Sequence, residues 1–252
     1  MRIFGLIGKS IDHSWSKAYF LQKFMSEGII DCLYENFQLD GLGNLRNLIQ
    51  SNEDLRGINI TVPFKLEVIP YLDGLDPLAE SVRAVNCIKI IRKKSSINLK
   101  GYNTDMIAFR ETIKPLLKKE YRNALVLGTG GASRAVCQAL KELNIEHTLV
   151  SRTQKAAVLT YPEISKKVIE NHQVIINTTP VGMNPDEGKC LPIPYQALTA
   201  DHLLYDLIYN PEETIFLKKS RDAGAQIKNG LEMLHLQAEL SWEIWNNQVS
   251  SF

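Results

Sequence analysis

The stretch VLGTGGASRAV, residues 126–136, has glycines at positions 128, 130 and 131 between an apolar run and a helical pattern. The apolar run, ALVLG (124–128), predicts a buried strand, and the apolar residues after the glycines repeat at helical spacing. A tight glycine turn between a strand and a helix lets backbone N–H groups bind the pyrophosphate of a dinucleotide. The sequence therefore predicts a Rossmann-like domain that begins halfway along the chain.

Ser133 stands where the usual GxGxxG pattern has its third glycine, so the glycine motif alone could also be an ordinary turn. The end of the next strand distinguishes a dinucleotide loop from such a turn. That strand ends at SRTQK, residues 151–155, where NAD-binding folds place a carboxylate on the ribose 2′-hydroxyl. The segment has no carboxylate, but Arg152 and Lys155 suit the 2′-phosphate of NADP. One charge-assisted hydrogen bond to a phosphate contributes roughly 1.5–3 kcal/mol. The sequence therefore predicts NADP as the cofactor, unless Arg152 is only a surface side chain.

The composition is that of an ordinary globular protein with room for two domains. The chain has 252 residues and a formal net charge of +1, so it lacks the basic excess of a nucleic-acid-binding surface. Its four cysteines and five histidines are scattered, without metal-ligand or disulfide spacing. No apolar run approaches the roughly 18 residues of a membrane-spanning helix. We therefore expect a cytoplasmic protein with no metal, no nucleic-acid partner and no membrane partner.

Short apolar runs alternate with helical patterns along the whole chain, which predicts an α/β protein with largely parallel sheets. The runs that predict strands are residues 2–8, 32–39, 58–63, 84–91 and 97–103 in the first half and 124–128, 147–151, 173–179, 203–209 and 225–229 in the second. Helical patterns fall near residues 16–27, 42–51, 64–72 and 76–83, from 105 toward 115, and over the last twenty residues. The final helix is amphipathic, with Leu231, Leu234, Ala238 and Trp242 on one face.

Polar side chains gather at predicted strand ends in the first half of the chain. They are Ser14, Ser16, Asn59, Thr61, Lys65, Asn86 and Asp105. A dehydrogenase needs groups that orient its substrate and one that manages the hydroxyl proton, and these side chains can supply both. Each also has an ordinary explanation: the serines and Asp105 as helix N-caps, Asn86 as a partner for backbone groups, and Lys65 as a solvated lysine.

At these residues the chain resembles the shikimate dehydrogenase family. The shared motifs run in the family's order over almost the whole length. They are HSWS (13–16), NITVPFK (59–65), AVN (84–86), GYNTD (101–105), GTGGAS (128–133), SRT (151–153), NTTPVGM (177–183), DLIYNP (206–211) and GLEMLHLQA (230–238). Each motif is weak alone, and nine of them in order are specific.

The resemblance implies a two-domain α/β fold. An N-terminal α/β substrate domain is expected over residues 1–110 and 231–252, because the C-terminal helix of the family returns to that domain. A Rossmann-like NADP-binding domain is expected over residues 111–230. This order explains why the glycine turn lies in the middle of the chain.

The resemblance also assigns roles to individual residues. Ser14 and Ser16 are implied to bind the substrate carboxylate. The other implied substrate-binding residues are Asn59, Thr61, Asn86, Gln237 and Tyr209, and the implied catalytic pair is Lys65 and Asp105. The implied NADP contacts are Gly128, Thr129, Gly130, Gly131, Ala132, Ser151, Arg152, Thr153, Thr178, Leu207, Gly230 and Met233.

Three positions depart from the family pattern. Ser151 stands where asparagine is usual before Arg-Thr, which bears on cofactor affinity. Arg83 and Cys87 flank the AVN motif where a glycine and a threonine are commoner, so the fit of the substrate pocket near Asn86 is less secure.

The activity implied is reversible, NADPH-dependent reduction of 3-dehydroshikimate to shikimate, a step of chorismate and aromatic amino acid biosynthesis. A lysine is almost fully charged at neutral pH, and a neighbouring carboxylate such as Asp105 favours that form. Lys65 is therefore suited to donate a proton to the developing alkoxide when the ketone is reduced. The expected partners are these small molecules alone, in a monomer or a homodimer.

Other functions fit the sequence less well. A quinate/shikimate dehydrogenase that uses NAD or quinate stays open, although Arg152 argues against NAD. A methylenetetrahydrofolate dehydrogenase does not account for the SxS, NITVPFK and GYNTD motifs, and a glutamyl-tRNA reductase needs a cysteine nucleophile and a basic surface. An inert NADP-binding regulatory protein would have no need to keep both Lys65 and Asp105.

Overall fold

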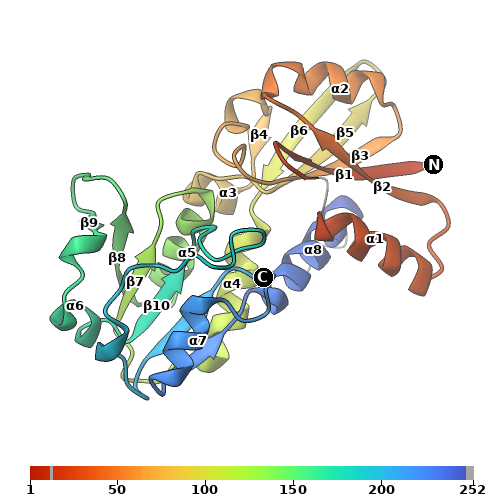
Figure 1. Cartoon of the computed structure of the whole chain (residues 1–252). Helices are drawn as coiled ribbons and strands as arrows, with labels where there is room; N and C mark the ends of the chain where they lie inside the picture. The colour runs from red at the N-terminus through yellow and green to blue at the C-terminus, as the bar shows by residue number, and fades with distance from the viewer. Residues whose placement is uncertain (12–13, 248–252) are drawn as a thin grey trace. The chain divides into compact units, whose positions relative to one another are not determined.

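The computed structural model describes residues 1–11 and 14–247, and Figure 1 shows their secondary structure. The chain divides into two compact units, Met1–Thr104 with Ala238–Phe252 and Asp105–Gln237. The described residues form two six-stranded sheets, one in each unit. The predicted α/β class is confirmed. His13, which precedes the serines of the HSWS motif, lies outside the described residues.

The sheet of the first unit is mixed. Its strands are β1 (Arg2–Gly8), β2 (Cys32–Gln38), β3 (Leu55–Ile60), β4 (Gly74–Leu75), β5 (Cys87–Lys93) and β6 (Ser96–Tyr102), in the order β2-β1-β3-β5-β6-β4. β1 is parallel to β2 and β3. A hairpin joins β5 to β6, so these two strands are antiparallel, and β5 is antiparallel to β3 as well. The sheet is therefore less parallel than the sequence predicts.

Helices cover both faces of this sheet. They are α1 (Trp15–Ser26), α2 (Leu45–Ser51), α3 (Pro77–Val82) and the end of α8 (Leu231–Trp245). Neighbouring residues of a strand face opposite sides, and Ile7 packs in the core with α2, whereas Leu6 packs in the core with α1 and α8. Accordingly, α2 lies on one face of the sheet and α1 on the other (Figure 1).

The prediction of a helix over residues 64–72 is wrong. The segment forms turns and a short 3₁₀ helix at Ile69–Tyr71 instead. Pro70 has no N–H to continue a helical ladder, and Pro63 precedes the segment. The two prolines leave too few residues between them for a stable helix.

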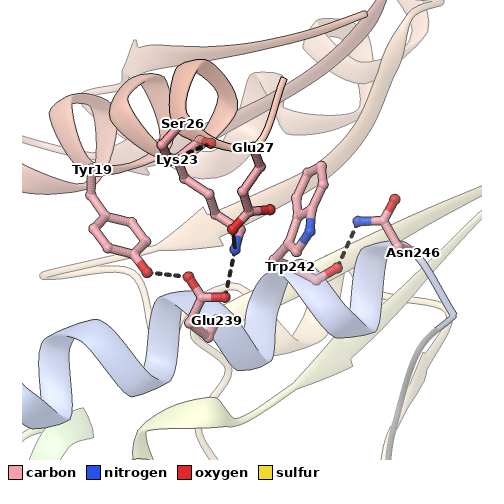
Figure 2. A network of polar contacts seen from close by, with 7 residues as sticks. All are labelled: Tyr19, Lys23, Ser26, Glu27, Glu239, Trp242 and Asn246. Atoms are coloured by element: carbon pink, nitrogen blue, oxygen red, sulfur yellow. Dashed lines mark hydrogen bonds and ion pairs between the residues drawn. The ribbon is translucent and has the colours of Figure 1, made fainter. Parts of the chain in front are cut away.

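A polar network joins α1 to α8 in the first unit, and Figure 2 shows it from close by. Glu239 of α8 accepts hydrogen bonds from Tyr19 and from the Lys23 ammonium of α1. Lys23 also donates to Glu27, at 2.7 Å, and its side chain is only 9% exposed. Burial, followed by the bond to Glu239, raises the pKa of Tyr19. The network holds the last turns of α8 on α1, beside the packing of Trp242 on Phe24.

We expect Glu239→Ala to lower the free energy of unfolding by about 1.5–3 kcal/mol, because a nearly buried ammonium loses one of its two carboxylate partners. Urea unfolding measures the loss. The matched control is Glu232→Ala on the same helix, since Glu232 is 61% exposed and its ion pair is with Lys228 on the surface. That surface pair is worth less than about 1 kcal/mol. Equal losses in the two variants would contradict the role of Glu239.

The sheet of the second unit is parallel throughout. Its strands are β7 (Asn123–Leu127), β8 (Glu146–Ser151), β9 (Leu159–Thr160), β10 (Val174–Asn177), β11 (Leu203–Asp206) and β12 (Gln226–Lys228), in the order β12-β11-β10-β7-β8-β9. All carboxyl ends therefore meet at one edge of the sheet, where ligands of open α/β sheets bind. The five longer predicted strands of this half are confirmed, and β9 was not predicted.

Helices lie on both faces of the parallel sheet as well. They are α4 (Thr104–Ile113), α5 (Gly131–Glu142), α6 (Lys166–Glu170), α7 (Ile215–Asp222) and the start of α8. Leu204 of β11 packs in one core with Phe216 of α7. The next residue, Tyr205, faces the other way and bonds Thr112 of α4, with 2.8 Å between the hydroxyl oxygens. α4 and α7 therefore cover opposite faces.

Candidate active site

The predicted strand–turn–helix around the glycines is confirmed. β7 ends at Leu127, Gly128 has φ +121°, and α5 begins at Gly131 with Gly130 as its N-cap. A Cβ on Gly128 would lie 2.5 Å from Oγ1 of Thr178, which itself donates to the Leu127 carbonyl at 2.8 Å. Only glycine fits this turn, and it leaves the N-terminus of α5 open to an anion.

The end of β8 carries exposed cations. Ser151 is buried, and its hydroxyl accepts a hydrogen bond from the backbone N–H of Thr153 at 3.2 Å. Arg152 and Lys155 are exposed, and the Lys155 ammonium donates to Oγ1 of Thr129 in the glycine turn at 3.2 Å. The β8 end and the glycine turn are therefore adjacent. The Ser151 hydroxyl therefore orders the turn that presents Arg152.

Thr178, Leu207 and Gly230 lie together past the ends of β10 and β11. The N–H groups of Thr178 and Leu207 donate to the last carbonyls of β7 and β10, at 2.9 and 3.0 Å. A Cβ on Gly230 would lie 2.1 Å from the Leu207 carbonyl oxygen, so this approach also requires glycine. Met233 follows on α8 and is buried. The remaining predicted contact, Ala132, lies in the first turn of α5.

A buried polar cluster occupies the first unit. Oδ1 of Asn59 accepts from the Tyr34 hydroxyl at 2.9 Å, and its Nδ2 donates to the Asn86 carbonyl and to Ser241, at 3.3 and 2.9 Å. The Asn86 side chain donates to Oγ1 of Thr104 and accepts from its N–H, at 2.8 and 2.7 Å. Both N–H groups of the Asn59 amide are therefore in use, and toward any ligand Asn59 acts only as an acceptor.

Sequence reasoning missed three members of this cluster: Tyr34, Thr104 and Ser241. Burial raises the pKa of Tyr34 well above its usual value, and a hydrogen bond with Ser16 opposes the rise. Tyr34 thus joins Ser16 to Asn59, and the Asn59 amide in turn bonds the Asn86 carbonyl. Thr104 stands inside the GYNTD motif, which is the one signal that pointed to it.

The other predicted residues of the first unit lie close along the chain to this cluster. Ser14 is the N-cap of α1, but its side chain makes no capping bond. Thr61 directly follows β3, and its N–H donates to the Ile7 carbonyl at 2.9 Å. Lys65 is half-buried in the turn after Pro63. Its carbonyl accepts from Val85 at 2.8 Å, which ties NITVPFK to AVN.

Three of the predicted substrate-binding and catalytic residues lie in the second unit. Asp105 is buried in the first turn of α4, where free N–H groups favour a carboxylate. Tyr209 is half-buried, and burial raises its pKa. Gln237 lies on α8, where its Nε2 donates to the Leu234 carbonyl at 2.9 Å.

Arg83 and Cys87, which flank the AVN motif, have different surroundings. Arg83 has φ +55° and ends α3 in the left-handed conformation that glycine adopts more readily. Cys87 is the buried first residue of β5 and packs with the α1 and α8 core.

Two negative findings concern residues 1–11 and 14–247. No helix there combines the length and the apolar character needed to cross a membrane. Within the same residues, no three His, Cys, Asp or Glu side chains are grouped so that they could hold a metal ion.

The glycine turn, the cations after β8 and the parallel sheet define the second unit as a dinucleotide-binding fold of the dehydrogenase class. Residues 6–88 of the first unit match the family model for the shikimate dehydrogenase substrate binding domain.

Known proteins extend this match over the whole chain. A shikimate dehydrogenase (NADP(+)) of Methanococcus maripaludis (strain C7) is 37% identical over 265 residues, covering 97% of this chain and 91% of that protein. Shikimate 5-dehydrogenase from Thermus thermophilus, solved in complex with NADP(H) and shikimate, is 28% identical with a TM-score of 0.84, covering 100% and 95%. Quinate dehydrogenase from Corynebacterium glutamicum, solved with NAD, is 25% identical with a TM-score of 0.84, covering 98% and 94%. The chain belongs to the shikimate dehydrogenase family.

We expect Gly128→Ala to destabilise the protein by about 1–3 kcal/mol, because it strains a backbone with positive φ and drives Cβ into Thr178. Urea unfolding of the two variants measures the difference. Gly130→Ala is the control, since its Cβ meets no atom within 4 Å and its φ is −89°. That control should lose less than about 1 kcal/mol. A Gly128 variant as stable as the control would show that the turn relaxes.

Proposed function

We propose that the chain catalyses the reversible reduction of 3-dehydroshikimate to shikimate with NADPH, in chorismate and aromatic amino acid biosynthesis. The observation that carries the proposal is that shikimate dehydrogenase motifs occupy strand ends in both units. The polar cluster of Asn59 and Asn86 lies in the first, and the glycine turn with Arg152 lies in the second. Relatives named as NADP(+)-dependent enzymes align with almost the whole chain.

The second unit fits NADP. The turn at Gly128 admits no side chain, and such a close backbone approach suits a pyrophosphate. Arg152 and Lys155 supply positive charge where a 2′-phosphate would lie, and no carboxylate stands among residues 151–155. When bound, NADPH supplies the hydride. The residues we assign to hold it are Gly128, Thr129, Gly130, Gly131, Ala132, Ser151, Arg152, Thr153, Thr178, Leu207, Gly230 and Met233.

We assign the substrate to hydrogen-bonding side chains. Ser14 and Ser16 are proposed for the carboxylate, and Ser14 suits this role because its hydroxyl makes no capping bond. The proposed partners of the ring hydroxyls or the carboxylate are Asn59, Thr61, Asn86, Tyr209 and Gln237. A site built from buried polar groups rejects analogues that lack a hydroxyl, because those groups would be left unpaired.

Lys65 and Asp105 are the proposed catalytic residues. The Lys65 ammonium donates a proton to the ketone oxygen as it gains negative charge, and Asp105 is assigned as its partner in this step. In the reverse direction, the same two residues are proposed to take up the hydroxyl proton.

The proposal extends to the domains and partners. Residues 1–110 and 231–252 form the substrate domain and residues 111–230 the NADP domain. The enzyme works in the cytoplasm on small molecules alone, without nucleic acid or membrane, as a monomer or homodimer. The alternative within the family is an enzyme that accepts quinate or NAD, and the absence of a carboxylate after β8 argues against NAD.

Initial rates at 340 nm with shikimate or quinate, each with NADP or NAD, test the function. We expect strong turnover only with shikimate and NADP. Arg152→Ala should raise the KM for NADP about 10- to 150-fold, which corresponds to the loss of one charge-assisted hydrogen bond. Comparable rates with quinate or NAD would favour the broader specificity. A folded protein that binds NADPH but turns over no pair would leave only a binding function.

We expect Lys65→Ala to lower kcat far more than it raises KM, because the proton donor acts on the transition state. Proton transfer of this kind contributes about 10²–10⁴-fold in rate. Steady-state kinetics with 3-dehydroshikimate separates the two constants, and Lys94→Ala in the exposed β5–β6 turn is the control. A large rise in KM with unchanged kcat would make Lys65 a binding residue instead.

A further inference from the structure

Two buried side chains face each other at the ends of neighbouring parallel strands. Asn177 closes β10 and Asp206 closes β11, and the two residues are partners in the strand register. Nδ2 of Asn177 donates to Oδ1 of Asp206 at 3.0 Å, and both residues are fully buried. Neither has a role in the site described above.

Every described partner of the Asp206 carboxylate is a neutral donor. Besides Asn177, the N–H of Ile208 donates to Oδ1 at 3.0 Å and the hydroxyl of Thr214 donates to Oδ2 at 2.6 Å. Burial raises the pKa of Asp206 to about 7, although the three donors oppose the rise. A buried acid without a cation stabilises a fold poorly. The three hydrogen bonds to the Asp206 carboxylate instead hold two segments of the chain in place.

The first segment held is the turn after β10. Oδ1 of Asn177 accepts from both the N–H and the hydroxyl of Thr179, at 2.9 and 2.7 Å. These two donors fix the orientation of the amide, so that its Nδ2 must face Asp206. Thr178 lies between Asn177 and Thr179 in the sequence, and its hydroxyl donates to the Leu127 carbonyl beside the glycine turn.

The second segment held is the chain after β11. Asp206 fixes the N–H of Ile208, and the Ile208 carbonyl accepts from the N–H of Gly230 at 3.0 Å. Gly230 in turn packs directly on the Leu207 carbonyl. Through Thr214, the N-cap of α7, the same carboxylate also fixes the start of that helix.

The strand order shows which half of the dinucleotide this end of the sheet serves. In a doubly wound sheet the dinucleotide lies across the carboxyl edge, with the adenosine half at the glycine turn and the following strand. Those elements are β7 and β8, where Gly128 and Arg152 lie. β10 and β11 lie on the opposite side of β7, so they receive the nicotinamide half.

We propose that Asp206, acting through its hydrogen bonds to Asn177 and Ile208, is a positioning residue that fixes Thr178 and Leu207 for the nicotinamide half of NADP. This inference rests on the proposed function. Misplacing a reacting group by about 1 Å can slow a reaction about 100-fold. The carboxylate therefore governs turnover and the surroundings of the nicotinamide, and leaves the affinity for the adenosine half unchanged.

The test compares Asp206→Ala with Asp206→Asn. An asparagine keeps one oxygen for Asn177 and Ile208 and turns its NH₂ toward the Thr214 oxygen, so it preserves the network without the charge. We expect Asp206→Ala to lower kcat at least 10-fold and to shift the fluorescence of bound NADPH toward that of free NADPH. Asp206→Asn should restore most of both. Adenosine 2′,5′-bisphosphate, which occupies only the adenosine half, should bind all variants within twofold by calorimetry.

Ser220→Ala is the matched control for lost stability in the same unit. Ser220 is fully buried on α7, and its hydroxyl donates to the Phe216 carbonyl of its own helix at 2.7 Å. We expect it to keep wild-type kcat and NADPH fluorescence. If Asp206→Ala does not fold, Asn177→Ala removes one of the two donors through which Asp206 is proposed to act, and should lower kcat about 3- to 10-fold with the same binding of the bisphosphate.

The outcomes separate the two claims. Failure of the wild-type protein to turn over shikimate would overturn the proposed function. With an active wild type, an Asp206→Ala variant with normal kcat and normal NADPH fluorescence would overturn the positioning role. Loss of bisphosphate binding in step with kcat would overturn it too, as would an Asp206→Asn variant as impaired as the alanine variant.

Discussion

The hydrogen bond between Asn177 and Asp206 is the contact on which the carboxyl edge of the second sheet depends. Parallel strands bring their carboxyl ends to one edge of the sheet, but the segment that follows each strand leaves the sheet in its own direction. This side-chain pair extends the β10–β11 ladder by one contact and ties both exits together. Gly128 and Gly230 allow the same segments to approach more closely than any side chain permits.

In the first unit, side-chain amides and hydroxyls connect the ends of neighbouring elements in a similar way. Asn59 and Asn86 join β3, β5 and the start of α4, and Ser241 adds the C-terminal helix to the same cluster. A fully satisfied buried network of this kind orders its members strongly. Toward a ligand, the Asn59 side chain can only accept a hydrogen bond, because both N–H groups of its amide already donate within the cluster. The polar network around Glu239 holds α8 on α1, outside this cluster.

The sequence predicts most of the strands and the glycine turn because these features depend on local patterns. The turn at Gly128 and the helix after it are visible as a short run of residues. Residues 64–72 show the limit, since apolar spacing suggests a helix that two prolines prevent. α6, with five residues, is too short to show a period, and α7 was missed as well.

Residues that act through distant partners could not be predicted. Tyr34 and Ser241 are unremarkable in the sequence and matter only because folding brings them to Asn59, 25 and 182 positions away. The close approach of Gly230 to Leu207 is equally invisible before the chain folds. For the ligand-binding residues, the family resemblance supplied roles that spacing alone left undecided, as for Lys65 and Asp105.

The central claim is that the carboxyl edge of the parallel sheet binds NADP with its adenosine half at β7 and β8. A crystal structure of the protein with NADP tests it most directly. The account predicts the 2′-phosphate within hydrogen-bonding distance of Arg152, the pyrophosphate at residues 128–131, and the nicotinamide beside Thr178 and Leu207. A 2′-phosphate bound away from Arg152, or a nicotinamide that contacts neither Thr178 nor Leu207, would contradict it.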